Sequence, residues 1–143
     1  MNKEDAILFL KNHQPLPDDK NLTTEIIEEF DKIREFFILE PDDEVISLFL
    51  NSYGNGDGWG VYPLVEDVLL NCTRENVILE IKKILEDKNT SDNIRYWVTQ
   101  NAEFFVDKRL EKGLKLSLTS ENKDISETAK YILDNETIYS TSI

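Results

Sequence analysis

Apolar residues recur every three or four positions along almost the whole of this 143-residue chain. That spacing places them on one face of an α-helix. Five glycines and four prolines leave little room for a turn-rich β-sandwich. The pattern predicts an all-α fold of about eight short helices, near residues 3–12, 23–39, 41–52, from Pro63 onward, 74–87, 92–105, 107–119 and 122–134.

Helix starts and repeats suggest how these helices are organised. Thr23 or Thr24 is suited to cap the second helix, and Pro41 suits the first position of the third. Aligning residues 94, 98 and 102 with residues 125, 129 and 133 gives a period of 31 residues between similar apolar faces. We therefore expect a HEAT-like stack of helix pairs, with an irregular bundle as the alternative. The predicted domain covers residues 1–135, and residues 136–143, rich in Ser and Thr, are expected to form a loose tail.

The chain is strongly acidic, with 29 Asp and Glu against 16 Lys and Arg and a net charge of −13. Residues 1–57 alone hold 14 acidic and 5 basic side chains. Such charge repels nucleic acid and anionic membranes and attracts a basic protein partner. The second predicted helix has an apolar stripe of Ile26, Phe30, Ile33 and Phe37. Glu25, Glu28 and Glu29 lie opposite this stripe. They are the candidate acidic contacts, although solvated surface is the simpler interpretation of any acidic face.

Catalytic and metal-binding patterns are missing from the sequence. The single cysteine, Cys72, has no neighbouring His or Lys to activate it, and His13 is the only histidine. We expect no enzyme activity, no metal and no cofactor. The first residues are acidic where a signal peptide would be basic, and no internal disulfide is possible. Cytoplasmic residence is the expectation.

The most distinctive stretch is residues 51–62, which holds four of the five glycines within seven positions, together with Tyr53, Asp57, Trp59 and Tyr62. It lacks the spacing of a phosphate-binding or calcium loop. Two interpretations stay open. Tyr53 and Trp59 plug a junction between two helices, or the loop contacts a partner, with Asp57, Trp59 and Tyr62 as the contact residues.

A second aromatic group is formed by Arg95, Tyr96 and Trp97. Helical spacing places Trp97 in the apolar stripe, so a core position is expected for it. Tyr96 falls on the other side of the helix and is a candidate surface anchor for a partner. For Arg95, pairing with neighbouring acids is the expectation.

Taken in order, four motifs resemble a group of small helical immunity proteins that accompany bacterial polymorphic toxins, including contact-dependent growth-inhibition systems. They are Leu16-Pro17-Asp18-Asp19, Pro41-Asp42-Asp43-Glu44, Gly56-Asp57-Gly58-Trp59-Gly60-Val61-Tyr62 and Ile94-Arg95-Tyr96-Trp97-Val98. The group is similar to HEAT-type helical repeats, and the resemblance spans about residues 16–134. It implies a protein that binds one cognate toxin domain, such as a basic nuclease, and neutralises it. The alternative is a HEAT-like adaptor that docks other protein partners.

Overall fold

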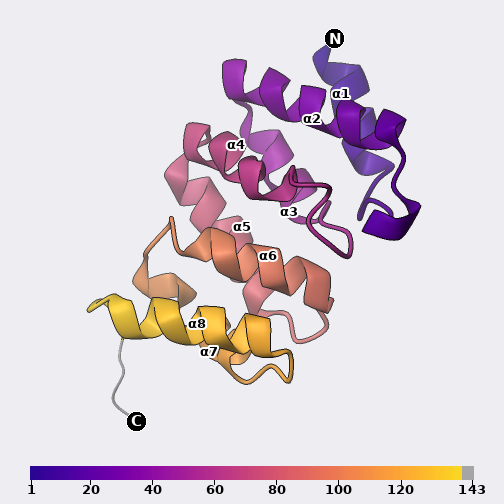
Figure 1. The fold of residues 1–143 in the computed structure, drawn as a ribbon. Coiled ribbons are helices and arrows are strands. Elements are labelled where there is room, and N and C mark those ends of the chain that lie inside the picture. Colours follow the sequence, from indigo (N-terminus) through magenta and orange to yellow (C-terminus); the bar gives the residue numbers. More distant parts are fainter. Residues whose placement is uncertain (140–143) are drawn as a thin grey trace. The chain divides into compact units, whose positions relative to one another are not determined.

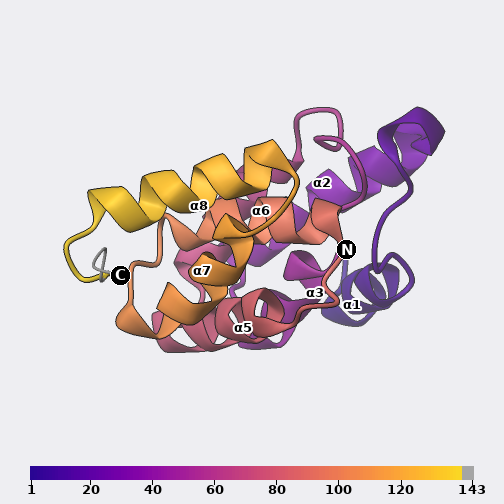
Figure 2. The ribbon, with the colours of Figure 1, turned by 90° about the horizontal axis from the view of Figure 1, so that it is seen from below.

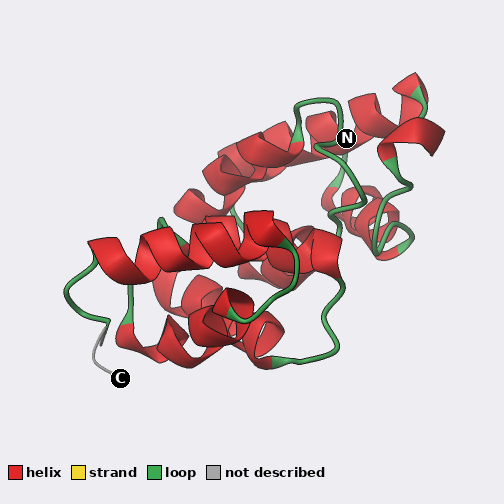
Figure 3. Ribbon diagram, turned by 60° about the horizontal axis from the view of Figure 1, so that its bottom comes forward, coloured by secondary structure: helices red, strands yellow, loops and turns green. Residues whose placement is uncertain are grey.

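The computed structural model describes residues 1–139, and that part of the chain contains eight α-helices, four short 3₁₀ helices and no strand (Figure 1, Figure 3). This confirms the predicted all-α class. The helices are α1 (Lys3–Lys11), α2 (Thr24–Leu39), α3 (Ile46–Leu50), α4 (Glu66–Asn71), α5 (Arg74–Glu86), α6 (Asp92–Ala102), α7 (Glu111–Leu118) and α8 (Lys123–Asn135). The 3₁₀ helices are Asp19–Asn21, Asp43–Val45, Tyr62–Val65 and Lys108–Leu110. Across the described residues, no helix combines the length and apolar character that a membrane crossing requires.

Local capping explains where the helices begin. The Thr23 hydroxyl accepts a hydrogen bond from the Ile26 N–H at 3.2 Å, as predicted for the start of α2. The third helix does not begin at Pro41. Asp42 caps the 3₁₀ helix Asp43–Val45 by accepting from the Glu44 N–H at 2.9 Å, and α3 follows directly. A tight 3₁₀ turn therefore replaces the first predicted turn of this helix.

The described residues form two compact units, and the division between them falls within the first turn of α5. The sequence predicted one domain over residues 1–135. The first unit, Met1–Asn76, is built around an aromatic core. The Phe30 ring lies 5.7 Å from Phe49, whose ring lies 6.2 Å from Phe37. All three side chains are fully buried. Such aromatic pairs contribute both apolar burial and favourable tilted ring geometry.

The second unit begins at Val77 and packs α8 against α6 and α7 (Figure 2). Five of the six apolar positions that share the 31-residue period are buried, and Ile94 at the start of α6 is half-buried. The buried five are Val98, Ala102, Ile125, Ala129 and Leu133. Gly113 lets α7 approach α5 closely, since a Cβ at this position would lie only 2.5 Å from the Leu85 Cβ.

Part of the expected tail is packed onto this unit. Tyr139 is only 2% exposed, and its hydroxyl accepts a hydrogen bond from the Asp107 N–H at 3.2 Å. The segment expected to be loose from Glu136 therefore contains a buried tyrosine. The rest of it, residues 140–143, lies outside the described residues.

Candidate functional site: the glycine loop

Residues 51–62, here called the glycine loop, connect α3 to the 3₁₀ helix Tyr62–Val65 and fold around Asp19. The Asp57 and Gly58 N–H groups donate to the two carboxylate oxygens of Asp19 at 3.1 and 3.0 Å. The Asp19 N–H in turn donates to the Asn55 carbonyl at 2.9 Å. The side chain and the backbone N–H of Asp19 therefore hold residues 55–58, the middle of the loop.

Glycine is required in this loop by close packing. A Cβ on Gly56, whose φ is +115°, would lie 2.2 Å from Asp19 Cγ. A Cβ on Gly58 would lie 2.5 Å from the Tyr62 ring. L-amino acids with side chains rarely adopt such positive φ values. The glycines thus bring the loop backbone against Asp19 and Tyr62, so the loop is anchored in place.

Tyr62 is buried rather than available to a partner, which corrects its prediction as a contact residue. Its ring lies 5.4 Å from Tyr53 and 6.1 Å from Phe30, and its hydroxyl accepts from the Gly54 N–H at 2.9 Å. Burial raises the pKa of Tyr62 to about 12. The 3₁₀ helix that starts at Tyr62 turns this side chain into the core. Tyr53 and Tyr62 together form the plug that the sequence suggested for Tyr53 and Trp59.

Trp59 is on the surface, with 49% of the residue exposed. Its backbone has φ +52°, and it is the one residue other than glycine with a positive φ among residues 1–139. The indole Nε1–H donates to the Asp19 carbonyl at 3.2 Å. A residue held in this conformation costs on the order of 1–3 kcal/mol, and such strain clusters at binding sites. Asp57 is exposed beside it and accepts from the Gly60 N–H at 3.2 Å.

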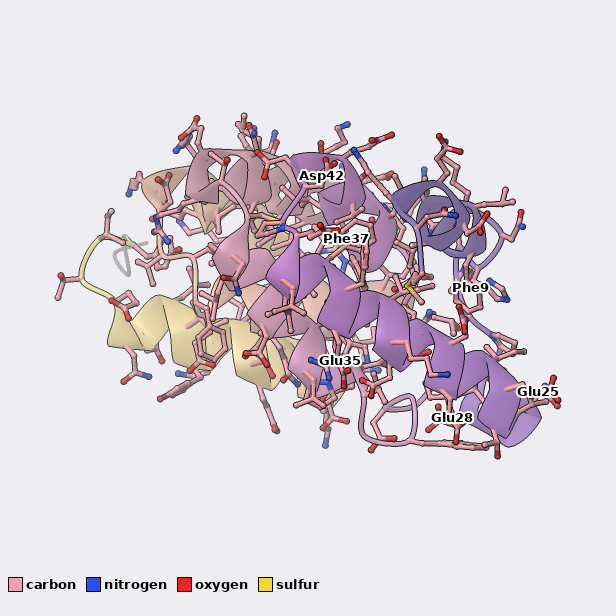
Figure 4. The ribbon with its side chains drawn as sticks, turned by 90° about the horizontal axis from the view of Figure 1, so that it is seen from above. Phe9, Glu25, Glu28, Glu35, Phe37 and Asp42 are labelled. Atoms are coloured by element: carbon pink, nitrogen blue, oxygen red, sulfur yellow. The ribbon has the colours of Figure 1, made fainter. Side chains whose placement is uncertain are left out.

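The acidic face of α2 is also accessible. Glu25 and Glu28 are exposed and Glu29 is half-buried. Within the part of the chain that the structure describes, none of the three has an ion pair. Figure 4 shows Glu25, Glu28 and Glu35 spread along α2, with Phe37 on the side opposite Glu35. The 3₁₀ helix that contains Asp19 leads directly into α2, so the acidic face and the anchor of the glycine loop are adjacent in sequence.

The Arg95-Tyr96-Trp97 group lies in the second unit. Trp97 is buried as predicted, and Tyr96 is half-buried with its ring edge-on to Trp97 at 4.9 Å. Arg95 is buried too, but its guanidinium donates to the carbonyls of Leu85 and Asp87 at 3.0 and 2.8 Å instead of pairing with a carboxylate. Burial lowers the pKa of Arg95. Arg95 therefore ties α6 to the end of α5.

Other reactive side chains are occupied in packing. Burial raises the pKa of the Cys72 thiol to about 11, which keeps it protonated near neutral pH. The His13 ring stacks on Phe9 at 4.0 Å, and its Nδ1 lies 2.7 Å from the Phe9 carbonyl oxygen. Over residues 1–139 there is no group of three or more His, Cys, Asp or Glu side chains placed to hold a metal ion.

Asp19 is the residue of this site that the sequence did not reveal. In the sequence it reads as one of two acids at a helix start, and it does begin a 3₁₀ helix. Its role depends on a contact 38 residues away. No pattern of residue types signals this contact in the sequence, because its donors are backbone N–H groups, which every residue except proline carries.

Comparisons with protein-family models, with curated proteins and with solved structures find no match to this chain.

Proposed function

We propose that this chain binds and neutralises a bacterial toxin domain, as an immunity protein of the producing cell, and has no catalytic activity of its own. The observation that carries the binding role is the geometry of Trp59. A large aromatic side chain is held half-exposed, on a strained backbone, by an anchored loop. The toxin as partner class is supported by the sequence resemblance alone.

A preorganised aromatic residue is well suited to anchor a protein interface. Fixing the loop before binding avoids the conformational entropy that an unstructured loop would lose on association. Tryptophan is among the residues that most often dominate interface energies. Trp59 would therefore supply the central contact, with Asp57 beside it.

The charge of the chain supports a basic partner. A net charge of −13 and the unpaired carboxylates of Glu25 and Glu28 would accelerate encounter with a basic surface, such as that of a nuclease. The bound chain would then block the toxin, either by covering its active site or by binding next to it.

The direct test is coexpression with the product of the reading frame immediately upstream. We expect the chain to restore growth of cells that express that product and to co-purify with it. Co-purification without any effect on growth would favour an adaptor that docks a protein partner. Failure both to rescue and to co-purify would reject the immunity function.

The Trp59→Gly variant separates binding from folding. Glycine adopts φ +52° without strain, so the loss of the indole contact is offset and the free energy of unfolding should change by no more than about 1 kcal/mol. Affinity for the partner should fall by about 30-fold or more, the effect of losing a central aromatic contact. Calorimetric binding and urea denaturation measure the two quantities.

Leu39→Ala serves as the matched control, because Leu39 is an apolar residue that is 83% exposed at the end of α2. Its affinity should stay at the wild-type value. Unchanged affinity in Trp59→Gly would reject Trp59 as a contact residue. A melting temperature that falls steeply in that variant would assign Trp59 a structural role.

Reversing the charges of Glu25 and Glu28 to lysine tests the acidic face. We expect association with a basic partner to slow by about tenfold at low salt and to depend less on ionic strength, while the melting temperature is retained. Stopped-flow mixing at two salt concentrations measures the rates. Glu40→Lys with Glu121→Lys makes the same change in net charge at other exposed positions. Equal slowing in both pairs would mean that net charge alone, rather than the face of α2, steers the partner.

A further inference from the structure

Within the second unit, α6 and α8 lie side by side (Figure 1, Figure 2). Side chains of these two helices line a groove. The groove has a volume of about 340 Å³. It is lined by Gln100 and Glu103 from the α6 side and by Glu127, Thr128, Tyr131 and Ile132 from α8. All of these residues belong to one unit, so the groove is a feature of that unit alone.

The groove carries negative charge that is not neutralised locally. Glu103 and Glu127 are exposed, and no Lys or Arg is among the lining residues. No ion pair to either carboxylate exists within residues 1–139, whereas Lys130, on the same helix as Glu127, pairs with Asp134. Both carboxylates are therefore free to receive a cation from outside.

The position of Glu103 adds to this negative potential. Glu103 is the C-cap residue of α6, and the last turn of that helix contains no basic side chain. The C-terminal end of a helix carries a partial negative charge, so a carboxylate there is unfavourable and a cation is favourable. The chain thus keeps a destabilising acid at the one end of α6 where an external cation would be stabilised.

Tyr131 gives the groove an aromatic wall. It lines the groove between α6 and α8, and 53% of the residue is exposed. The face of a phenol ring attracts a guanidinium by cation–π interaction and stacking. The Thr128 hydroxyl donates a hydrogen bond to the Asp124 carbonyl oxygen at 2.8 Å. Its oxygen can therefore only accept a hydrogen bond from a group in the groove. Carboxylates, an acceptor oxygen and an aromatic face are complementary to a planar, multiply donating cation.

We propose that this groove binds an arginine side chain presented by a protein partner, as a second interaction surface. Arginine fits better than lysine, since its planar fork can donate to Glu103 and Glu127 while the same plane stacks on Tyr131. The proposal does not rest on the glycine loop or on the identity of the partner as a toxin.

The test uses the full chain and a capped tetra-arginine peptide as the probe. In an NMR titration with ¹⁵N-labelled protein, we expect the largest amide shifts around Gln100, Glu103, Glu127 and Tyr131. Glu103→Gln with Glu127→Gln should raise the dissociation constant by about fivefold or more, and Tyr131→Ala by about threefold. A capped tetra-lysine peptide of the same charge should bind more weakly than tetra-arginine.

The control pair Glu40→Gln with Glu121→Gln removes the same charge from other exposed positions and should leave the dissociation constant near the wild-type value. Weakening in this pair equal to that in the groove pair would show diffuse attraction to an acidic protein and would overturn the proposal. So would equal binding of the two peptides.

Folding is checked by the melting temperature. Glu103→Gln removes an acid from a helix C-terminus and should keep or raise the melting temperature while it weakens binding. A melting temperature that falls in step with affinity would give Glu103 a structural role and reject the site. Trp59→Gly should bind the peptide as the wild type does, which separates failure of this proposal from failure of the loop proposal.

Discussion

Replacing Tyr62 with alanine should lower the free energy of unfolding by about 3–5 kcal/mol, the usual cost of removing a fully buried large aromatic side chain. Tyr62 is 0% exposed and packs against Tyr53, Phe30 and the backbone of Gly58. The substitution therefore opens a cavity directly beneath the glycine loop. Urea denaturation followed by circular dichroism measures the loss. A change below about 1 kcal/mol would mean that the loop does not depend on this ring.

Tyr62→Phe isolates the contribution of the hydroxyl. The ring is retained, but the buried Gly54 N–H loses its acceptor, which should cost about 1–3 kcal/mol. The two variants together divide the role of Tyr62 between packing and hydrogen bonding. A variant as stable as the wild type would show that another acceptor or a water replaces the hydroxyl.

The same residue predicts a loss of stability at high pH. Burial raises the folded-state pKa of Tyr62 to about 12, above its usual value of about 10. The folded state then holds this proton more tightly than the unfolded chain, so the contribution is complete below about pH 10 and is lost as pH rises towards 12. Tyr62→Phe should show a smaller decline over this interval. An identical decline in both proteins would assign the alkaline sensitivity to other groups.

The helices could be predicted from the sequence because their apolar stripes are long and regular. In α2, Phe30, Ile33 and Phe37 are buried as predicted, while Ile27 rather than Ile26 completes the stripe. The error is one residue, because both neighbouring isoleucines fit a helical period at the end of a stripe. Arg34 was not expected in the core, where it donates to Asp31 at 2.8 Å.

The candidate site was harder to predict because its contacts are distant in sequence. Composition singled out residues 51–62 and indicated large aromatic groups in contact positions, and Trp59 and Asp57 are exposed there. It could not show that Tyr62 faces inward, since a tyrosine beside a proline fits a buried or an exposed position. Nor could it connect the loop to Asp19, because hydrogen bonds to backbone N–H groups leave no pattern of residue types.

The anchoring of the loop links its structure to its proposed role. Asp19 receives hydrogen bonds from Asp57 and Gly58, and its carbonyl accepts from the Trp59 indole. These contacts fix the two residues that precede Trp59 as well as its ring. A partner would thus meet a side chain whose direction is already set, and more of the contact energy would appear as affinity.

In the second unit the largest effect is expected from Arg95→Ala, with a loss of about 3 kcal/mol in the free energy of unfolding. Arg95 is 6% exposed and donates to the carbonyls of Leu85 and Asp87 and, at 2.8 Å, to the Ser117 hydroxyl. Alanine removes all three hydrogen bonds and leaves a cavity where α5, α6 and α7 meet. Arg95→Lys should recover only part of the loss, because a single ammonium cannot reproduce the planar fork.

Arg109→Ala is the control for this substitution, because the Arg109 side chain is 39% exposed and pairs with Asp107 at the surface. Its cost should stay below about 1 kcal/mol. Amide hydrogen exchange adds a regional readout: Arg95→Ala should reduce protection first in α6 and α7, which its guanidinium connects to the end of α5. Protection that falls equally throughout residues 1–139 would show that Arg95 stabilises the whole chain cooperatively. An Arg95→Lys variant as stable as the wild type would show that positive charge alone suffices at this position.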